Sequence, residues 1–215
     1  MTAGLFYVYT DPGTVDETEF HDWYDHEHGP ARLTVPGIGP AYRYRALDEL
    51  KPPWLVLYEL DRPDVIDSPE YKALGANASD RDKAVGAGLA TLDRRVYEQI
   101  SDDGSPAGRL APVILAVAMS VPEGSEDDLA AWYAEEHIPM LLKVPGWRRI
   151  RRFRLTRALD GPGPDFLSVS ELAGPEVLEE PGYRSAVSTP WRDRVVASAL
   201  RRERRVFGLR NTIGA

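Results

Sequence analysis

WYDHEHGPARLTVPG (residues 23–37) and WYAEEHIPMLLKVPG (residues 132–146) are two versions of one sequence within a single chain of 215 residues. The shared Trp, Tyr, Glu-His, Pro and Val-Pro-Gly all recur 109 positions later. Further matches follow in the same order: Arg43 with Arg152, Glu59 with Glu171, Tyr71 with Tyr183 and Tyr97 with Phe207. An ordered series of this kind predicts that the chain contains two copies of one structural unit.

Each copy has the same predicted order of elements. Short apolar and β-branched runs predict strands, and amphipathic stretches after candidate caps predict helices. In the first copy we expect strands at 5–10, 42–46, 54–60 and 94–100, with helices at about 14–33, 69–74 and 84–92. In the second copy we expect strands at 147–155, 166–172 and 204–209, with helices at about 125–143, 181–187 and 191–200. The capping boxes are Thr14–Glu17 and a weaker Ser125–Asp128.

The order β-α-β-β-α-β is that of the ferredoxin-like unit, or split βαβ. Helices on one face of such a sheet leave its other face bare, and that face must be buried. We therefore expect an α+β protein in which two ferredoxin-like βαββαβ halves pack sheet to sheet as an intramolecular barrel. The expected halves are 1–100 and 110–215, joined by a polar linker at 101–109.

The motif W-Y-x-x-E-H-x-P, followed by V-P-G and then R-x-R on a strand, resembles the EthD-like branch of the dimeric α+β barrel superfamily. The resemblance covers nearly the whole chain, twice over. It implies a pocket between the helices and the sheet of each half, with a helix His or Glu at its mouth. The superfamily includes cofactor-free monooxygenases, lactone isomerases, dehydratases and haem-linked enzymes, so the resemblance does not select one reaction.

The Glu-His pairs are the candidate catalytic groups. At 100° per residue, Glu27 and Glu136 fall on the apolar face of the helix, while His28 and His137 lie at its edge. A histidine titrates near neutral pH, which suits a general base or acid, and the glutamate would orient the substrate or transfer a second proton. The alternative is structural: the glutamate caps a buried donor or pairs with an arginine, and the histidine bonds at the helix end.

The first half carries more acid–base groups, because His21 and Asp25 have Ala130 and Ala134 as counterparts. Asp25 precedes His28 by three residues and could fix its tautomer. Together with His21 these residues also have the spacing of a two-His, one-carboxylate metal site. That face is expected to point to solvent, so we predict no metal.

Aromatic and arginine side chains near the motif are the candidate substrate-binding residues: Trp23, Tyr24 and Arg43 with Trp132, Tyr133 and Arg152. Arg43 and Arg45 alternate on one strand face, as do Arg152 and Arg154. They either anchor a carboxylate or phenolate or pair with Glu59 and Glu171 on the next strand. Aromatic residues are expected to shape the first pocket or its core: Phe6, Tyr7, Tyr9, Trp54 and Tyr58.

Composition excludes several classes of function. The net charge of −8 argues against nucleic acid as the main partner, and the basic run ALRRERRVFGLR (199–210) is expected to be a solvated face. There is no cysteine, hence no thiolate chemistry or Cys-ligated cofactor. We expect no signal peptide and no membrane span, and the sequence contains no phosphate-loop or dinucleotide-binding motif. We expect a cytoplasmic protein without a cofactor; pairing of the tandem chain as a homodimer stays open.

Three functions remain. The first is a cofactor-independent dehydratase, isomerase, cyclase or lyase acting on a small, partly apolar carbonyl- or phenol-bearing metabolite, with His28 as base. The second is a non-catalytic protein that binds a small molecule. The third is a cofactor-free quinol monooxygenase, in which the same pocket deprotonates a quinol for attack on oxygen.

Overall fold

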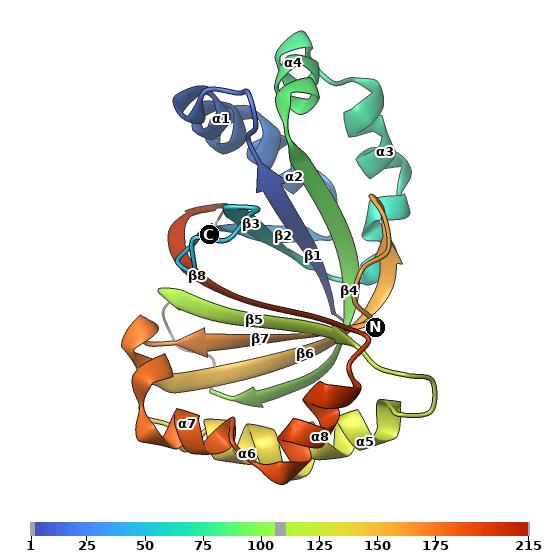
Figure 1. Ribbon diagram of the computed structural model, residues 1–215. Helices are drawn as coiled ribbons and strands as arrows, with labels where there is room; N and C mark the ends of the chain where they lie inside the picture. The colour runs from blue at the N-terminus through green and yellow to red at the C-terminus, as the bar shows by residue number, and fades with distance from the viewer. Residues whose placement is uncertain (1–2, 106–110, 215) are drawn as a thin grey trace. The chain divides into compact units, whose positions relative to one another are not determined.

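The computed structural model describes residues 3–105 and 111–214. Eight strands are hydrogen-bonded to their neighbours in the order β1-β3-β2-β8-β5-β7-β6-β4, and this order closes on itself as a barrel (Figure 1). Helices and strands alternate as βαββαβ in each half of the chain. The predicted α+β barrel is therefore confirmed.

The chain divides into two compact units. Unit 1 comprises the described parts of residues 1–99, 155–163 and 209–215, and unit 2 those of 100–154 and 164–208. Three strands are divided between them. Each unit therefore contains the end of a strand that begins in the other unit.

In unit 1, strands β1 and β3 pair antiparallel with Phe6 opposite Tyr58, and α-helices cover one face of the sheet (Figure 1). The strands are β1 (Gly4–Asp11), β2 (Ile38–Ala46), β3 (Trp54–Leu60) and β4 (Thr91–Gly104). The helices are α1 (Glu17–Trp23), α2 (Gly29–Leu33), α3 (Pro69–Ala76) and α4 (Asp80–Gly88). A 3-10 helix, η2 (Pro63–Asp67), precedes α3.

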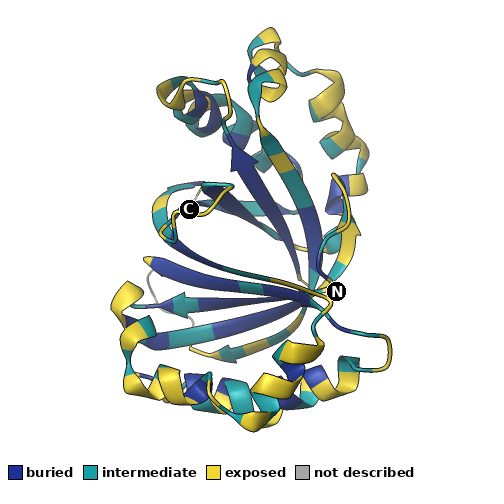
Figure 2. Cartoon of the chain, in the orientation of Figure 1, coloured by how far each residue is buried: buried dark blue, intermediate teal, exposed yellow. Residues whose placement is uncertain are grey.

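Unit 2 repeats this plan, with Leu115 of β5 opposite Ser170 of β7. Its strands are β5 (Val113–Ser120), β6 (Trp147–Ala158), β7 (Phe166–Leu172) and β8 (Arg201–Ile213). Its helices are α5 (Glu126–Trp132), α6 (Ile138–Leu141), the 3-10 helix η4 (Pro175–Glu179), α7 (Pro181–Ala186) and α8 (Pro190–Ser198). In both units the strands are largely buried and the outer faces of the helices are exposed (Figure 2).

The Val-Pro-Gly of each copy is a turn that needs glycine. Gly37 and Gly146 have φ of 91° and 86°, a left-handed conformation that other residues rarely adopt. A Cβ on Gly37 would also lie 2.9 Å from Val65, and one on Gly146 would lie 2.7 Å from Val177. The turn therefore packs the end of the helix tightly against the following 3-10 segment in both units.

Three local predictions need correction. The first helix is capped by Asp16, whose side chain accepts from the backbone of Thr18 and Glu19, so the predicted cap at Thr14 is wrong. Ser125 does occupy the N-cap of α5, but its side chain makes no capping hydrogen bond. Strand β4 continues to Gly104, so residues 101–104 are strand, and residues 106–110 of the expected linker lie outside the described residues.

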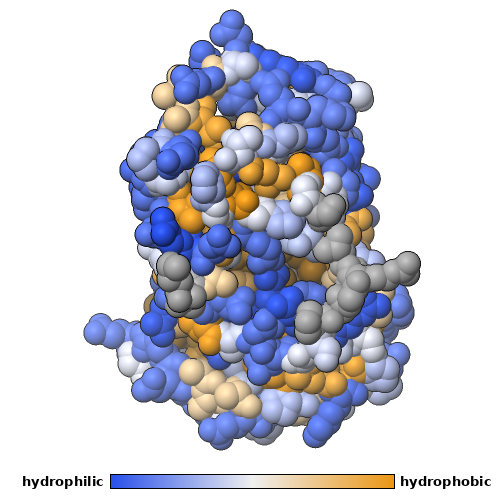
Figure 3. All heavy atoms as spheres, turned by 180° about the vertical axis from the view of Figure 1, so that it is seen from behind, coloured by the Kyte–Doolittle hydropathy of each residue, from blue (hydrophilic) through white to orange (hydrophobic). Residues whose placement is uncertain are grey.

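The surface seen from behind is mostly hydrophilic, with hydrophobic patches between the charged side chains (Figure 3). Within residues 3–105 and 111–214, no helix has the length and apolar character needed to cross a membrane.

Candidate functional site

The repeated Trp-Tyr…Glu-His segment is a π-helix in both units. Residues Tyr24–His28 and Tyr133–His137 interrupt the α-helix with i→i+5 hydrogen bonds. This wider turn places residues five apart nearly in line, whereas an α-helix at 100° per residue would separate them by about 140°. The Trp23 and His28 rings therefore lie 4.1 Å apart, and the Trp132 and His137 rings stack at 4.3 Å.

Because of the π-helix, the side-chain directions expected from an α-helical wheel do not hold in this segment. His28 turns inward, with 17% of its side chain exposed, while Glu27 is more exposed at 34%. The prediction that the glutamate faces the sheet and the histidine lies at the edge is wrong, because the wheel assumes α-helical geometry throughout. π-segments occur frequently at functional sites, which supports a role for this histidine position.

Both glutamates link their helix to the helix that follows in space. Glu27 accepts a hydrogen bond from Ser79, the N-cap of α4. Glu136 accepts from Thr189, the N-cap of α8, at 2.6 Å, and from the Trp132 indole at 3.1 Å. In each unit the glutamate thus joins two helices through a side-chain hydroxyl, a structural role that differs from the backbone cap or strand-arginine partner expected from the sequence.

In unit 1, His28 bonds to an aspartate that the sequence analysis missed. The Nδ1 atom lies 2.8 Å from Asp82 Oδ1 of α4, and the same oxygen accepts from the Trp23 indole at 3.1 Å. Burial lowers the pKa of His28 to about 4, although the Asp82 hydrogen bond opposes this. Asp25 was predicted to orient this ring, and that prediction is wrong: Asp82 does so.

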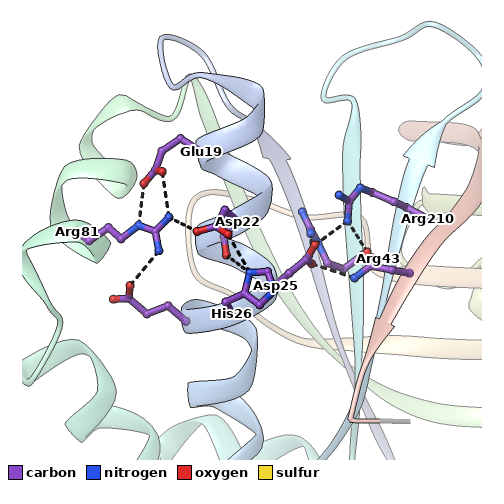
Figure 4. A network of polar contacts seen from close by, with 9 residues as sticks. Glu19, Asp22, Asp25, His26, Arg43, Arg81 and Arg210 are labelled. Atoms are coloured by element: carbon purple, nitrogen blue, oxygen red, sulfur yellow. Dashed lines mark hydrogen bonds and ion pairs between the residues drawn. The ribbon is translucent and has the colours of Figure 1, made fainter.

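Asp25 belongs instead to a network around a buried arginine (Figure 4). The Arg43 guanidinium, only 1% exposed, pairs with Asp25 through Nη1, and its Nη2 lies 3.0 Å from His21 Nδ1. Arg210 and Asn211 of β8 also donate to Asp25, at 2.8 and 2.9 Å. Arg43 therefore pairs with the helix carboxylate rather than acting as a free anchor for substrate.

The same network separates the three residues whose spacing resembles that of a metal site. His21 and Asp25 contact Arg43, whereas His28 contacts Asp82. Burial, together with the charges of Arg210 and Arg43, lowers the pKa of His21 to about 4. Across the described residues, no group of three or more His, Cys, Asp or Glu is placed to hold a metal ion.

The interior of unit 1 is filled by tyrosine. Tyr24 and Tyr58 are 2% and 1% exposed, and their hydroxyls lie 2.9 Å apart between the π-helix and the sheet. Phe6 packs against Tyr58 at 5.9 Å. All five aromatic residues that were expected to shape the pocket or its core are buried, and Phe6, Trp54 and Tyr58 belong to the packed core of unit 1. A cavity of 240 Å³ lies instead among α2, α3 and α4, and His28 and Asp82 are among its lining residues.

The equivalent interior of unit 2 is hollow. By strand register Ser168 and Ser170 stand where unit 1 has Val56 and Tyr58, and both serines line a cavity of 310 Å³. Its apolar walls come from strands and helices alike: Leu115, Val117, Met119, Trp132, Leu141, Trp147, Val187 and Val196. Two serines in an otherwise apolar strand were the sequence signal for this cavity.

His137 is among the titratable residues that line this cavity. Its Nδ1 is buried without a hydrogen-bond partner among the described residues. Burial lowers its pKa to about 4; a hydrogen bond with the Ala186 backbone opposes this, and the positive charge of Arg192 adds to it. A neutral imidazole with one nitrogen free of hydrogen bonds is able to accept a proton, and His137 belongs to the lining of the cavity.

The predicted arginines of unit 2 have other partners. Arg152 stacks on the Tyr133 ring at 4.1 Å and is buried. Glu171 meets Arg149 at 3.3 Å and Arg151 at 3.9 Å, so its predicted pairing with Arg152 is wrong. Tyr133 and Trp132, two of the predicted substrate-binding residues, line the cavity.

The basic run at 199–210 is more than a solvated face. Arg205 is buried, and Arg202 and Arg204 line the cavity of unit 2 together with Arg192 of α8. Alternation along β8 explains this difference, because every second residue points toward the helices. The expectation of a purely solvated run is therefore wrong.

No model of a protein family matches the chain, and no curated protein matches it. Solved structures do match. An anthrone oxidase-like protein has a TM-score of 0.68 at 15% identity, covering 98% of this chain and 92% of that one. A mutant chlorite dismutase from Candidatus Nitrospira defluvii gives 0.60 at 10%, covering 98% and 93%. A monooxygenase-like protein from Listeria innocua gives 0.52 at 10%, covering 98% and 95%. At identities of 10–15% these similarities concern the fold alone, that of an α+β barrel.

Proposed function

We propose that the chain is a cofactor-free enzyme acting on a small, partly apolar metabolite that bears a carbonyl or phenol group. The reaction takes place in the cavity of unit 2, with His137 as the base. The observation that carries this proposal is that His137, whose Nδ1 has no hydrogen-bond partner among the described residues, belongs to the lining of a cavity of 310 Å³. Enclosed apolar cavities with a few converging polar groups are the usual sites of small-molecule binding.

The chemistry is a proton transfer. Neutral His137 takes a proton from a carbon next to a carbonyl, or from a phenol, and the electron pair moves onto the substrate oxygen. The imidazolium then returns the proton to another carbon, which gives isomerisation, or to a departing hydroxyl, which gives dehydration. Nearby arginines would stabilise the developing oxyanion.

His28 remains the alternative base. Its Nδ1 is held by Asp82 at 2.8 Å, which leaves Nε2 as the acceptor, and it lines the 240 Å³ cavity of unit 1. We favour His137 because the larger cavity runs between the helices and the sheet, where the π-helix aims the ring.

A second candidate is a cofactor-free oxygenase. The names of the anthrone oxidase-like and monooxygenase-like structures favour it. Here the same deprotonation would yield a phenolate that dioxygen oxidises. A third candidate, a protein that binds a small molecule unchanged, uses the same cavity without the base.

We also propose that the two halves arose by tandem duplication within the EthD-like branch, with halves at 1–100 and 110–215. The π-helix falls at the same place in both copies. The bonds from Glu27 to Ser79 and from Glu136 to Thr189 are equivalent as well.

The test is a mass-spectrometric comparison of a metabolite extract incubated with three proteins: the natural chain, His137→Gln and His28→Gln. We expect a species to be consumed by the natural chain and by His28→Gln, but not by His137→Gln. Loss of conversion only in His28→Gln would move the site to unit 1. Running each incubation with and without oxygen separates the oxygenase from the isomerase or lyase, and a co-purifying ligand left unchanged by all three proteins would refute catalysis.

A further inference from the structure

Three arginines converge on one side of the cavity in unit 2: Arg192 from α8 and both Arg202 and Arg204 from β8. Strand register sets their direction. Arg202 stands opposite Met119 and Arg204 opposite Val117, and both of these β5 residues line the cavity. Arg202 is exposed, so this cluster, the arginine mouth, lies where the cavity meets solvent.

The charge of the arginine mouth is poorly neutralised. Arg204 donates to the Tyr183 hydroxyl at 3.0 Å, and Arg192 meets Asp193, a carboxylate that is 66% exposed. Within residues 3–105 and 111–214, no carboxylate pairs with Arg202 or Arg204. Burial and the charges of Arg192 and Arg204 lower the pKa of Arg202, as expected for cations gathered without a counter-ion.

At the equivalent place in unit 1, the arginine charge is neutralised by a carboxylate. Arg94 is the counterpart of Arg204 by strand register, and it is paired with Asp160 through two hydrogen bonds of 2.7 and 2.8 Å. Leu92 stands in place of Arg202, and Asp82 in place of Arg192. Each difference between the units makes unit 2 more positive at this point.

We propose that the unit 2 cavity binds a small apolar acid, with its carboxylate at Arg202 and Arg204 and its apolar body against Trp132 and Leu115. A guanidinium presents a planar pair of donors that matches a carboxylate. The cavity walls are mainly apolar, which suits an aromatic or alicyclic body. The assignment rests on the proposed function only in that the reacting atom of such an acid would lie near His137.

The probe is 2-naphthoate, and its neutral partner is 2-naphthamide, which has the same ring system and no charge. Binding is measured by calorimetry and by quenching of tryptophan fluorescence, since Trp132 and Trp147 line the cavity. We expect 2-naphthoate to bind more tightly than the amide. Arg202→Gln should weaken 2-naphthoate by about tenfold, the loss typical of a hydrogen bond to a charged group, and leave the amide unchanged.

Two control variants locate the effect. Arg154→Gln removes the same charge from an exposed position of β6 that does not line the cavity, so it should leave binding unchanged. Ser170→Tyr should abolish binding of both probes, because it places in unit 2 the ring that fills unit 1. Arg202 has no ion-pair partner among the described residues, so its substitution should not impair folding.

Equal affinity for the two probes would overturn the proposal, as would equal weakening by Arg154→Gln and Arg202→Gln, which would indicate diffuse attraction. Absence of binding by 2-naphthoate would overturn it too. The His137→Gln variant distinguishes a failure of this proposal from a failure of the proposed function. If that variant still binds 2-naphthoate while the natural chain converts nothing, the acid site stands and catalysis fails. If a neutral metabolite is converted equally well by Arg202→Gln, catalysis stands and the acid site fails.

Discussion

Replacing Tyr58 with serine should open in unit 1 the cavity that unit 2 already has. Tyr58 is 1% exposed and its hydroxyl lies 2.9 Å from that of Tyr24. Truncating a buried aromatic side chain costs about 3–5 kcal/mol. The Tyr24 hydroxyl is left without its partner, which costs a further 1–3 kcal/mol or so. We therefore expect Tyr58→Ser to lose about 4–8 kcal/mol, a large part of the roughly 5–15 kcal/mol that stabilises a typical domain.

The assay is urea and thermal unfolding, with Ser170→Ala as the matched control. At about 2–4 °C per kcal/mol for a chain of this size, Tm should fall by roughly 8–32 °C in Tyr58→Ser. Ser170 lines an existing cavity, so its truncation removes little packing and should cost less than about 1 kcal/mol. Millimolar p-cresol should restore part of the lost Tm in Tyr58→Ser by filling the new space.

Equal losses in Tyr58→Ser and Ser170→Ala would refute this reasoning. That result would mean that the two interiors are packed alike, and the choice of unit 2 for the proposed site would lose its basis.

Three further predictions concern the buried polar groups. Burial lowers the pKa of His28 and His137 from 6.5 to about 4, so the unfolded chain binds more protons than the folded chain between these pH values. The free energy of unfolding should therefore fall as the pH falls from about 6.5 to 4, and its slope in a pH series of urea titrations should be shallower in His137→Gln. Arg43→Ala should cost about 3–5 kcal/mol in the same titration because it leaves Asp25 without its buried partner; a loss under 1 kcal/mol would contradict the ion pair. Glu136→Ala should destabilise by about 1–3 kcal/mol through the lost bonds to two side chains, whereas Glu136→Gln, which keeps an acceptor oxygen, should cost less; equal losses would point to the charge instead.

The repeat made the fold predictable. Residues shared between the copies are those that the fold requires, such as Gly37 and Gly146 at left-handed turns. Apolar strands of the interior have a pattern that sequence alone reveals, and β3 and β7 begin and end where predicted. The barrel then follows from two sheets that each need a cover for one face.

The site was harder to predict because its geometry depends on the π-helix. One extra residue in the turn rotates all that follows, so a wheel at 100° per residue exchanges the environments of His28 and Glu27. Nothing in the composition of the segment distinguishes a π-helix from an α-helix. Partners distant in sequence were missed for a different reason: Asp82 follows His28 by 54 residues, and no local pattern connects them.

The differences between the two copies also indicate where the site lies. Aligning the two copies residue by residue exposes Tyr58 against Ser170 and Asp82 against Arg192. The first difference marks the cavity and the second marks its charge. Comparing the copies for what differs, rather than for what they share, would have pointed to unit 2.

The division of strand β8 between the units has a consequence for the order in which the protein folds during synthesis. Asp25 bonds to Arg210, 185 residues later, and both belong to unit 1. At about 5–20 residues per second, the ribosome takes roughly 10–40 s to make the intervening chain. During that time the network around Arg43 and Asp25 lacks Arg210, and the edge of strand β2 is not yet paired with the end of β8. Unit 1 is therefore begun first and finished last, so a nascent chain stalled before residue 209 should expose an unpaired strand edge to other proteins in the cell.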